Sequence, residues 1–411
     1  MAIESILDED ITGRLLRIKD EFSEELVSLL DFWSSQGLDA THGGFEGNID
    51  HYGHINTRAN KGCILNTRIL WTFSSAYRTT KDERYGRLAK RAYTYIKDYF
   101  WDKEFGGLFL ELDYLGNPID KKKQAYVQGF GIYAFSEYYR AVADKESLNL
   151  AKDLYAILEN NFLEPEHRGY VEALTENWQA IEDMRLSDKD LNAPKTMNTH
   201  LHILEPYTNL FRVWPDEQIK KSIDSLLKLF SDKIYNHDSH HLQLFFDLEW
   251  NSQFEEVSFG HDIEAAWLMN EASMVINQGI LDEEIYKITN ELVKATLAEG
   301  LDTDGSVFNE KKGDTLDTDK HWWPQAEAMV GFMDAFENNQ NIDYLIHIEM
   351  LWSFIKNYMI DRENGEWFWR VNAANIPIST EDKLGFWKGP YHNGRALMEL
   401  IERIDKMTDK S

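Results

Sequence analysis

A repeat of about sixty residues runs along this chain of 411 residues. It is marked by a turn phrase whose glycines are Gly44, Gly107, Gly169, Gly305 and Gly365. The intervals between them are 63, 62, 136 and 60 residues, and the interval of 136 corresponds to two periods. The phrase that is missing from that interval falls near residues 235–240, where no glycine occurs. Six units therefore fill the chain, and a fixed period of this length indicates a repeated supersecondary unit.

Each unit is predicted to contain two helices of different character. The first is amphipathic, with apolar residues at helical spacing such as Leu88, Ala92, Tyr95, Ile96 and Tyr99. A glycine turn and a short Phe/Leu-rich hairpin follow, for example over residues 107–112. The second helix, as in 66–73, is apolar with few charges, which is typical of a helix buried on nearly all sides. Six helical hairpins with an outer and an inner ring predict an all-α fold, an (α/α)6 barrel with short β-hairpins in the rim loops. An open solenoid would carry capping units at both ends, and none is obvious.

The composition favours a single domain over residues 1–411, because no Pro-, Gly- or Ser-rich linker divides the chain. No apolar run approaches the roughly 20 residues that a membrane span needs. The acidic start at residues 1–10 does not resemble a secretory signal. The single cysteine, Cys63, excludes an intramolecular disulfide and a cysteine-rich zinc site. A cytoplasmic protein is expected, as a monomer or a weak homodimer.

The net charge of −28 arises from 71 acidic and 43 basic residues. Such a surface repels phosphate backbones and anionic lipids, so neither nucleic acid nor membrane is expected as a partner. A neutral small molecule is the substrate that suits this charge best.

The starts of the six inner helices are expected to face a common funnel. At this level the repeat places Arg68, Tyr126, Gln128, Asn198, His202, His261, Glu264, Trp322, Trp323, Gln325, Glu327, Trp387 and His392. A purely structural inner ring would more often carry Leu, Ala or Ile there. Three of these residues are histidines, whose ordinary pKa of about 6.5 suits proton transfer near neutral pH. The pattern therefore predicts a catalytic site at the rim.

Five phrases in order along the chain resemble the N-acylglucosamine 2-epimerase superfamily, and within it the branch of cellobiose 2-epimerases. They are Lys61–Arg68, Met197–Glu205, Phe259–Trp267, Trp322–Ala328 and Trp387–His392. The resemblance covers essentially the whole chain, and it also implies an (α/α)6 barrel. The implied activity is epimerisation at C2 of a reducing-end sugar, without metal or nucleotide, so no cofactor is expected.

The resemblance also implies roles for individual residues. His261 and His392 correspond to the acid/base pair, with His202 and Arg68 assisting. Sugar contacts are implied for Tyr126, Asn198, Glu264, Trp387 and one of Trp322 and Trp323. Two histidines on opposite walls can exchange a proton at C2, and a permanently cationic arginine suits the enediolate that forms between the two proton transfers.

Aromatic residues favour a disaccharide, because each of two sugar rings can stack on an indole. The candidate platforms are Trp322, Trp323, Trp369 and Trp387. Asp190, in the polar loop 187–192, is a candidate hydrogen-bond partner for a hydroxyl above the funnel. Glu327 can equally contact substrate or pair with a neighbour. The sequence does not choose among cellobiose, lactose and mannobiose.

Other interpretations of the same residues remain open. An N-acylglucosamine 2-epimerase or an aldose–ketose isomerase acting on a monosaccharide would use the same proton chemistry. A glycoside hydrolase with this fold would need two opposed carboxylates, for which Asp262, Glu264 and Glu327 are candidates. His200 is expected to point away from the funnel. His237, His240 and His241 lie in the turn without glycine, and a metal site is not expected there.

Overall fold

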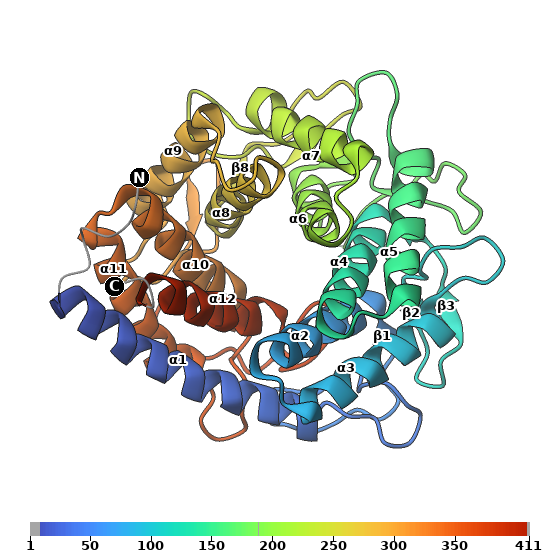
Figure 1. The fold of residues 1–411 in the computed structure, drawn as a ribbon, viewed down its shortest axis with the longest axis horizontal. Coiled ribbons are helices and arrows are strands. Elements are labelled where there is room, and N and C mark those ends of the chain that lie inside the picture. The colour runs from blue at the N-terminus through green and yellow to red at the C-terminus, as the bar shows by residue number, and fades with distance from the viewer. Residues whose placement is uncertain (1–8, 188, 409–411) are drawn as a thin grey trace.

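The computed structural model describes residues 9–187 and 189–408 of the chain. Twelve α-helices in these residues form two concentric rings (Figure 1). The outer helices are α1 (Glu9–Ser35), α3 (Glu83–Tyr95), α5 (Lys145–Ile157), α7 (Glu217–Leu229), α9 (Glu283–Glu299) and α11 (Ile342–Phe354). The inner helices are α2 (Cys63–Thr80), α4 (Ala125–Val142), α6 (Met197–Val213), α8 (Phe259–Ile276), α10 (Trp322–Asn339) and α12 (Tyr391–Thr408). The predicted two-ring architecture is confirmed.

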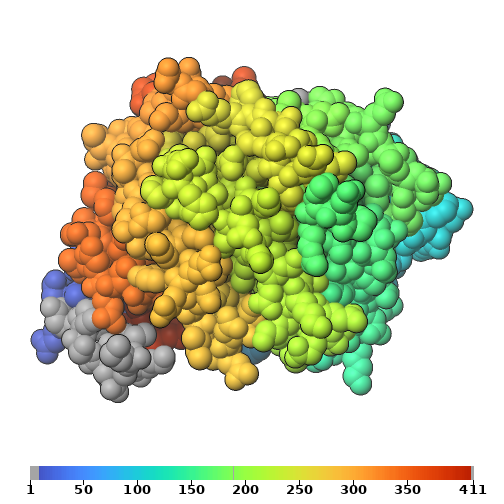
Figure 2. Space-filling model, turned by 90° about the horizontal axis from the view of Figure 1, so that it is seen from above, coloured from blue at the N-terminus to red at the C-terminus, as the bar shows by residue number. Residues whose placement is uncertain are grey.

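Contacts between the first and last helices close the ring. Each inner helix packs against the next, from α2 to α12, and α12 packs against α2. The long outer helix α1 lies along α12, so the two ends of the chain share one hairpin (Figure 1). Viewed at right angles to Figure 1, the green, yellow and orange segments lie against one another and form a continuous wall (Figure 2). The structure is thus a closed (α/α)6 barrel and not an open solenoid.

Burial explains the difference between the two rings. In α8 nearly every residue from Phe259 to Ser273 is buried, because other helices surround it on several sides. The outer helix α3 buries one stripe, which includes Tyr85, Ala89 and Ala92. No helix in the described part of the chain has an apolar stretch long enough to cross a bilayer.

The hairpins that pack tightly join an inner helix to the outer helix that follows it. Only Lys81 and Asp82 connect α2 to α3; Lys81 adopts a left-handed conformation with φ of 58°, and Asp82 caps α3 by accepting the backbone N–H of Arg84. The long segment with the glycine turn therefore joins one hairpin to the next. In the sequence repeat, each unit begins with an outer helix and ends with the inner helix after the glycine turn. In the structure, each tightly packed hairpin begins with an inner helix, so the two kinds of unit differ by one helix.

Short strands in the rim segments connect neighbouring units. They are β1 (Lys61–Gly62), β2 (Glu111–Leu112), β3 (Pro118–Asp120), β4 (Lys123–Gln124), β5 (Ala173–Leu174), β6 (Lys195–Thr196), β7 (Phe245–Phe246), β8 (Glu256–Ser258), β9 (Glu310–Lys312), β10 (Thr315–Asp317), β11 (Lys320–His321) and β12 (Arg370–Val371). The strands β1, β4, β6, β8 and β11 directly precede inner helices, and each pairs antiparallel with a strand of the next rim segment: β2, β5, β7, β9 and β12. This pairing sets the position of the start of five inner helices: α2, α4, α6, α8 and α10.

The glycine turns follow the outer helices. Four outer helices continue into five-residue π-helical segments before the turn: η1 (Ile96–Phe100), η2 (Leu158–Phe162), η3 (Phe230–Ile234) and η4 (Ile355–Met359). At Gly44, where φ is +63°, a Cβ atom would lie 2.7 Å from the Tyr95 ring. The fourth turn has no glycine, and His240 takes the left-handed conformation there with φ of 62°. This explains the missing phrase in the repeat.

A buried lysine binds most of the turns to the segment before an inner helix. Lys61, for example, donates to Asp39 Oδ2 at 2.7 Å and to the carbonyl of Gly43 at 2.7 Å. Equivalent pairs join Lys123 to Asp102, Lys195 to Glu164, Lys320 to Asp302 and Lys383 to Asp361. These ion pairs hold the rim in place, and the sequence analysis did not identify them.

Candidate active site

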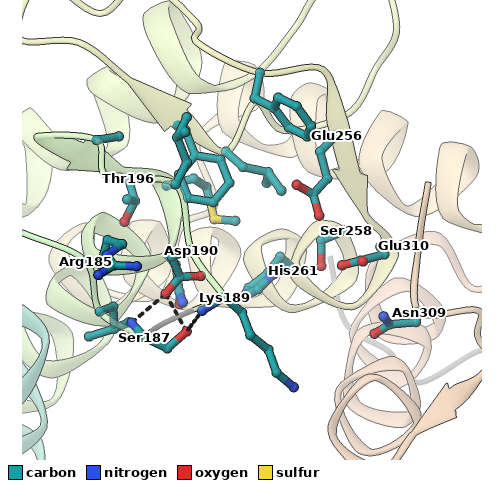
Figure 3. A pocket seen from close by; sticks show the side chains of 18 of the residues that line it. Arg185, Ser187, Lys189, Asp190, Thr196, Glu256, Ser258, His261, Asn309 and Glu310 are labelled. Carbon is teal, nitrogen blue, oxygen red and sulfur yellow. Dashed lines mark hydrogen bonds between the residues drawn. The ribbon is translucent and has the colours of Figure 1, made fainter. Parts of the chain in front are cut away.

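The starts of the inner helices surround a small cavity of about 200 Å³. It is lined by Arg68, Tyr126, Leu186, Ser187, Asp190, Asn198, His202, His261, Glu264, Trp322, Trp323, Trp387 and His392. A larger cavity of about 700 Å³ adjoins it, and the two share His261, Trp323, Asn198 and the loop residues Leu186, Ser187 and Asp190. Figure 3 shows this larger cavity, with Asp190 and Ser187 on one side and Ser258 and Glu310 on the other. The repeat thus brings most of the predicted site residues together.

His392 lies in the first turn of α12, and a glutamate of α10 binds its ring. Its Nδ1 atom is 2.6 Å from Glu327 Oε1. Glu327 is fully buried and does not line either cavity, so it faces the histidine and not the space for a ligand. Because Nδ1 is occupied, Nε2 is the nitrogen of His392 that remains for a substrate.

His202 lies at a kink in α6. Pro206 has no N–H to bond the carbonyl of His202 four residues earlier, and His202 itself has non-helical torsions, with φ of −86° and ψ of 15°. Its Nδ1 atom is 3.1 Å from Glu205 Oε2, and its Nε2 atom is 4.0 Å from Glu264 Oε2. The kink therefore displaces this imidazole from the regular helical path at the level of the cavity.

His261 lies in the first turn of α8, where Ser258 Oγ is 2.7 Å from its Nδ1 atom. The Trp323 ring packs against both His261 and His392, with centroid distances of 4.6 Å and 5.9 Å. All three histidines thus bind a partner through Nδ1, and all three line the small cavity.

The electrostatics of the cavity keep the three imidazoles neutral. Burial lowers the pKa of His261 to about 4. Burial, followed by the nearby Arg68 guanidinium, lowers the pKa of His202 and of His392 well below the ordinary histidine value. A neutral imidazole has a free lone pair, so each ring can accept a proton at neutral pH.

Arg68 and three polar atoms complete the inner cavity. Arg68 donates to the Trp387 carbonyl at 2.5 Å and to the Tyr126 hydroxyl at 3.0 Å, which places a guanidinium beside the histidines. Asn198 Oδ1, Glu264 Oε2 and Trp322 Nε1 are buried and have no hydrogen-bond partner within the described residues. Buried polar atoms normally have partners, so these donors and acceptors suit a ligand rich in hydroxyl groups.

Arg395, in α12, lies beneath the cavity and was not assigned a role in the sequence analysis. Its guanidinium donates to Glu205 Oε1, to Glu264 Oε1 at 2.9 Å and to Glu327 Oε1 at 2.6 Å. A glutamate inside each of three apolar inner helices was the available signal, because buried carboxylates need partners. The sequence could not show that one arginine serves all three.

The tryptophans of the predicted sugar platforms separate into two groups. Trp322, Trp323 and Trp387 line the small cavity, and Trp323 also lines the larger one. Trp369 lines neither cavity; it packs on Trp322 with ring centroids 4.8 Å apart. Asp190 lines both cavities, and its Oδ2 atom accepts the backbone N–H and the hydroxyl of Ser187, each at 2.8 Å.

The remaining histidines of the sequence analysis have structural partners. His200 Nε2 accepts the backbone N–H of Tyr170 at 2.9 Å, so this ring holds the rim segment that precedes β5. His237 bonds the Ser231 carbonyl, His240 the Tyr235 hydroxyl and His241 the carboxylate of Asp262. The three rings do not converge on a common point.

A cluster of Glu264, Glu327 and His392 has the geometry of a potential cation site. The guanidinium of Arg395 already binds Oε1 of both glutamates and supplies the positive charge there. The two carboxylates also share one guanidinium nitrogen, so they do not stand on opposite sides of a bond as a hydrolase requires.

Comparison with known proteins agrees with this geometry. Residues 43–393 match the family profile described as N-acylglucosamine 2-epimerase (GlcNAc 2-epimerase). A cellobiose 2-epimerase from Bacteroides fragilis is 46% identical over 387 residues, which are 93% of this chain and 98% of that protein. The structure of cellobiose 2-epimerase from Bacillus thermoamylovorans superposes with a TM-score of 0.91 at 40% identity, over 94% of this chain and 100% of that one. The enzyme of the same name from Spirochaeta thermophila gives 0.92 at 36% identity, over 98% and 100%.

Proposed function

This chain belongs to the N-acylglucosamine 2-epimerase family, and from that membership we propose that it epimerises C2 of the reducing-end glucose of β-1,4-linked disaccharides. Cellobiose would become 4-O-β-D-glucosyl-D-mannose, and lactose would react in the same way. The observation that carries the proposal is the set of three neutral imidazoles, each bonded through Nδ1, around one cavity.

The reaction begins with opening of the pyranose ring, which requires a base at the anomeric hydroxyl and an acid at the ring oxygen. One of His261 and His392 takes both roles in turn: its neutral imidazole accepts the proton of the anomeric hydroxyl and then donates it to the ring oxygen as the bond between C1 and that oxygen breaks. The C2–H bond of the open aldehyde is then acidic enough for an imidazole to remove its proton. The electrons of that bond form the enediolate, whose negative charge lies beside the Arg68 guanidinium.

Inversion follows when the proton returns to the opposite face of C2. One imidazole becomes an imidazolium by accepting the C2 proton, and it passes a proton to an enediolate oxygen. The opposite imidazole takes a proton from the enediol so formed and delivers it to the other face of the planar carbon, so both rings end neutral. The lowered pKa values of both histidines favour the return of the proton. His202 and Glu264 line the same cavity, and we assign them to the hydroxyls around C1 and C2.

The two adjoining cavities support a disaccharide as the substrate. The reducing-end ring occupies the small cavity between Trp322, Trp323 and Trp387, and Asn198 and Tyr126 bind its hydroxyls. The second ring extends into the larger cavity, where Asp190 is a hydrogen-bond partner.

The test is product analysis by carbohydrate chromatography after incubation with cellobiose, lactose, N-acetylglucosamine, glucose and mannose separately. The proposal predicts glucosyl-mannose from cellobiose and slower or no turnover of the monosaccharides. Release of free glucose from cellobiose, or turnover of N-acetylglucosamine alone, would contradict it.

A further inference from the structure

The buried guanidinium of Arg395 contacts no space that a ligand can enter. Arg395 is 1% exposed and lines neither of the two adjoining cavities. Its side chain lies against the rings of Trp267 and Tyr391, with guanidinium-to-centroid distances of 4.8 Å and 4.3 Å. Its N–H groups donate instead to three carboxylates from three different inner helices.

Each of these carboxylates controls a different group of the cavity. Glu205, from α6, uses its other oxygen to bind His202 Nδ1. Glu327, from α10, accepts Arg395 and His392 on the same Oε1 atom. Glu264, from α8, binds Arg395 through Oε1 and lines the small cavity itself. One guanidinium therefore contacts the carboxylates that bind His202 and His392, and it also contacts Glu264 of the proposed active site.

Charge balance in this buried cluster also depends on the arginine. Burial raises the pKa of Glu264 to about 8, so this carboxyl keeps a proton at neutral pH. Burial, followed by the neighbouring Glu264, raises the pKa of Glu327 well above the ordinary carboxyl value, and the hydrogen bond from Trp267 opposes that rise. The N–H group that Arg395 donates to Glu327 Oε1 also favours the ionised carboxylate.

We propose that Arg395 is the positioning residue of this site: it holds Glu205, Glu264 and Glu327 so that His202 and His392 keep the orientation and tautomer that proton transfer needs. This inference rests on the proposed function. An ionised Glu327 accepts the Nδ1–H of His392 and leaves the Nε2 lone pair toward the substrate. A protonated Glu327 would donate to Nδ1, place the histidine proton on Nε2 and remove the base.

The cluster faces titratable or charged side chains from all six inner helices. They are Arg68 of α2, Tyr126 and Tyr133 of α4, His202 and Glu205 of α6, His261 and Glu264 of α8, Glu327 of α10, and Tyr391, His392 and Glu399 of α12. Removing the cation from among these groups favours proton uptake by the carboxylates.

Two substitutions separate charge from geometry. Arg395→Met removes both the charge and the planar group. We expect the pH at which kcat falls on the acid side of its pH profile to rise by at least about one unit, because Glu327 binds its proton more tightly. Arg395→Lys keeps the charge but loses the planar guanidinium that donates to several carboxylates at once. We expect kcat to be lower by about tenfold, with the acid-side fall of its pH profile at the same pH as in the wild type. KM for cellobiose should stay within about twofold in both, since a lost uniform binding contact would raise KM instead.

Arg403 provides the matched control. It lies two turns further along α12, is also buried, and binds Asp334 and Glu337, and it lines neither of the two cavities of the candidate active site. Arg403→Met and Arg403→Lys are expected to lower the unfolding temperature and to retain the wild-type pH profile. If the Arg395 variants change only stability, as these controls should, or change KM rather than kcat, the proposal is wrong.

The tautomer of His392 can also be measured in the protein without substrate, which tests the positioning role separately from the epimerase activity. With ¹⁵N-labelled histidine, NMR should report a proton on Nδ1 of His392 in the wild type and on Nε2 in Arg395→Met. If Arg395→Met does not fold, Arg395→Lys should show His392 as a mixture of tautomers. An unchanged Nδ1–H tautomer in the folded variants would refute the positioning role, whereas failure of the wild type to convert cellobiose would refute only the proposed function.

Discussion

Ser258→Ala is expected to slow the reaction without weakening substrate binding. Ser258 directly precedes α8, and its hydroxyl is 2.7 Å from His261 Nδ1. In the resting protein the ring is neutral, and a neutral hydrogen bond contributes about 1 kcal/mol. When His261 accepts the substrate proton, the same contact becomes a charge-assisted bond of about 1.5–3 kcal/mol. The difference, about 0.5–2 kcal/mol, corresponds to a fall in kcat of about two- to thirtyfold.

The assay is the initial rate of epimerisation over a range of cellobiose concentrations. KM should stay within about twofold, because a group that acts mainly after proton transfer changes kcat more than ground-state binding. Ser258→Thr is the matched control, since it retains a hydroxyl at the same position. A wild-type kcat in Ser258→Ala, or an equal loss in Ser258→Thr, would show that the hydroxyl does not support His261 as the reasoning requires.

Three further results are expected. His261→Asn and His392→Asn should each abolish epimerisation while near-UV circular dichroism stays unchanged; substantial activity in both would refute the assignment. The pH profile of kcat/KM should rise to a plateau and fall again. On the acid side the rate falls first as Glu327, whose pKa is raised by burial, gains a proton, and then as His261 is protonated near its pKa of about 4; on the alkaline side it falls as Glu264 loses its proton near its pKa of about 8. Lys123→Met should destabilise the fold by about 3 kcal/mol in chemical denaturation, because it leaves the buried Asp102 carboxylate without its partner, with activity at 25 °C retained; an unchanged denaturation midpoint would show that the pair is unimportant.

The repeat was sufficient to predict the architecture and the level of the site. A period of about sixty residues, with a glycine turn in each unit, places the start of every inner helix at one end of the barrel. Arg68, His202 and His261 line one cavity for this reason, although they are far apart in the sequence. The offset of the packing unit could not be predicted, because it depends on which neighbour each outer helix contacts in three dimensions.

Contacts across the barrel could not be predicted from the sequence. The convergence of Glu205, Glu264 and Glu327 on Arg395 joins four helices and exists only after the ring has closed. Periodicity likewise places Trp369 near the rim but does not show that it packs behind Trp322. In both cases the sequence gives the level in the barrel, whereas the direction of the side chain depends on long-range packing.

The most direct test of the account is proton NMR of cellobiose incubated with the protein in D2O. Proton abstraction by an imidazole and its return from solvent-exchanged groups predict deuterium at C2 of the 4-O-β-D-glucosyl-D-mannose that forms. A chelator in the reaction should leave this rate unchanged if the histidines alone transfer the proton. Formation of the mannose epimer with its C2 proton fully retained, or release of free glucose, would contradict histidine-mediated epimerisation at this site.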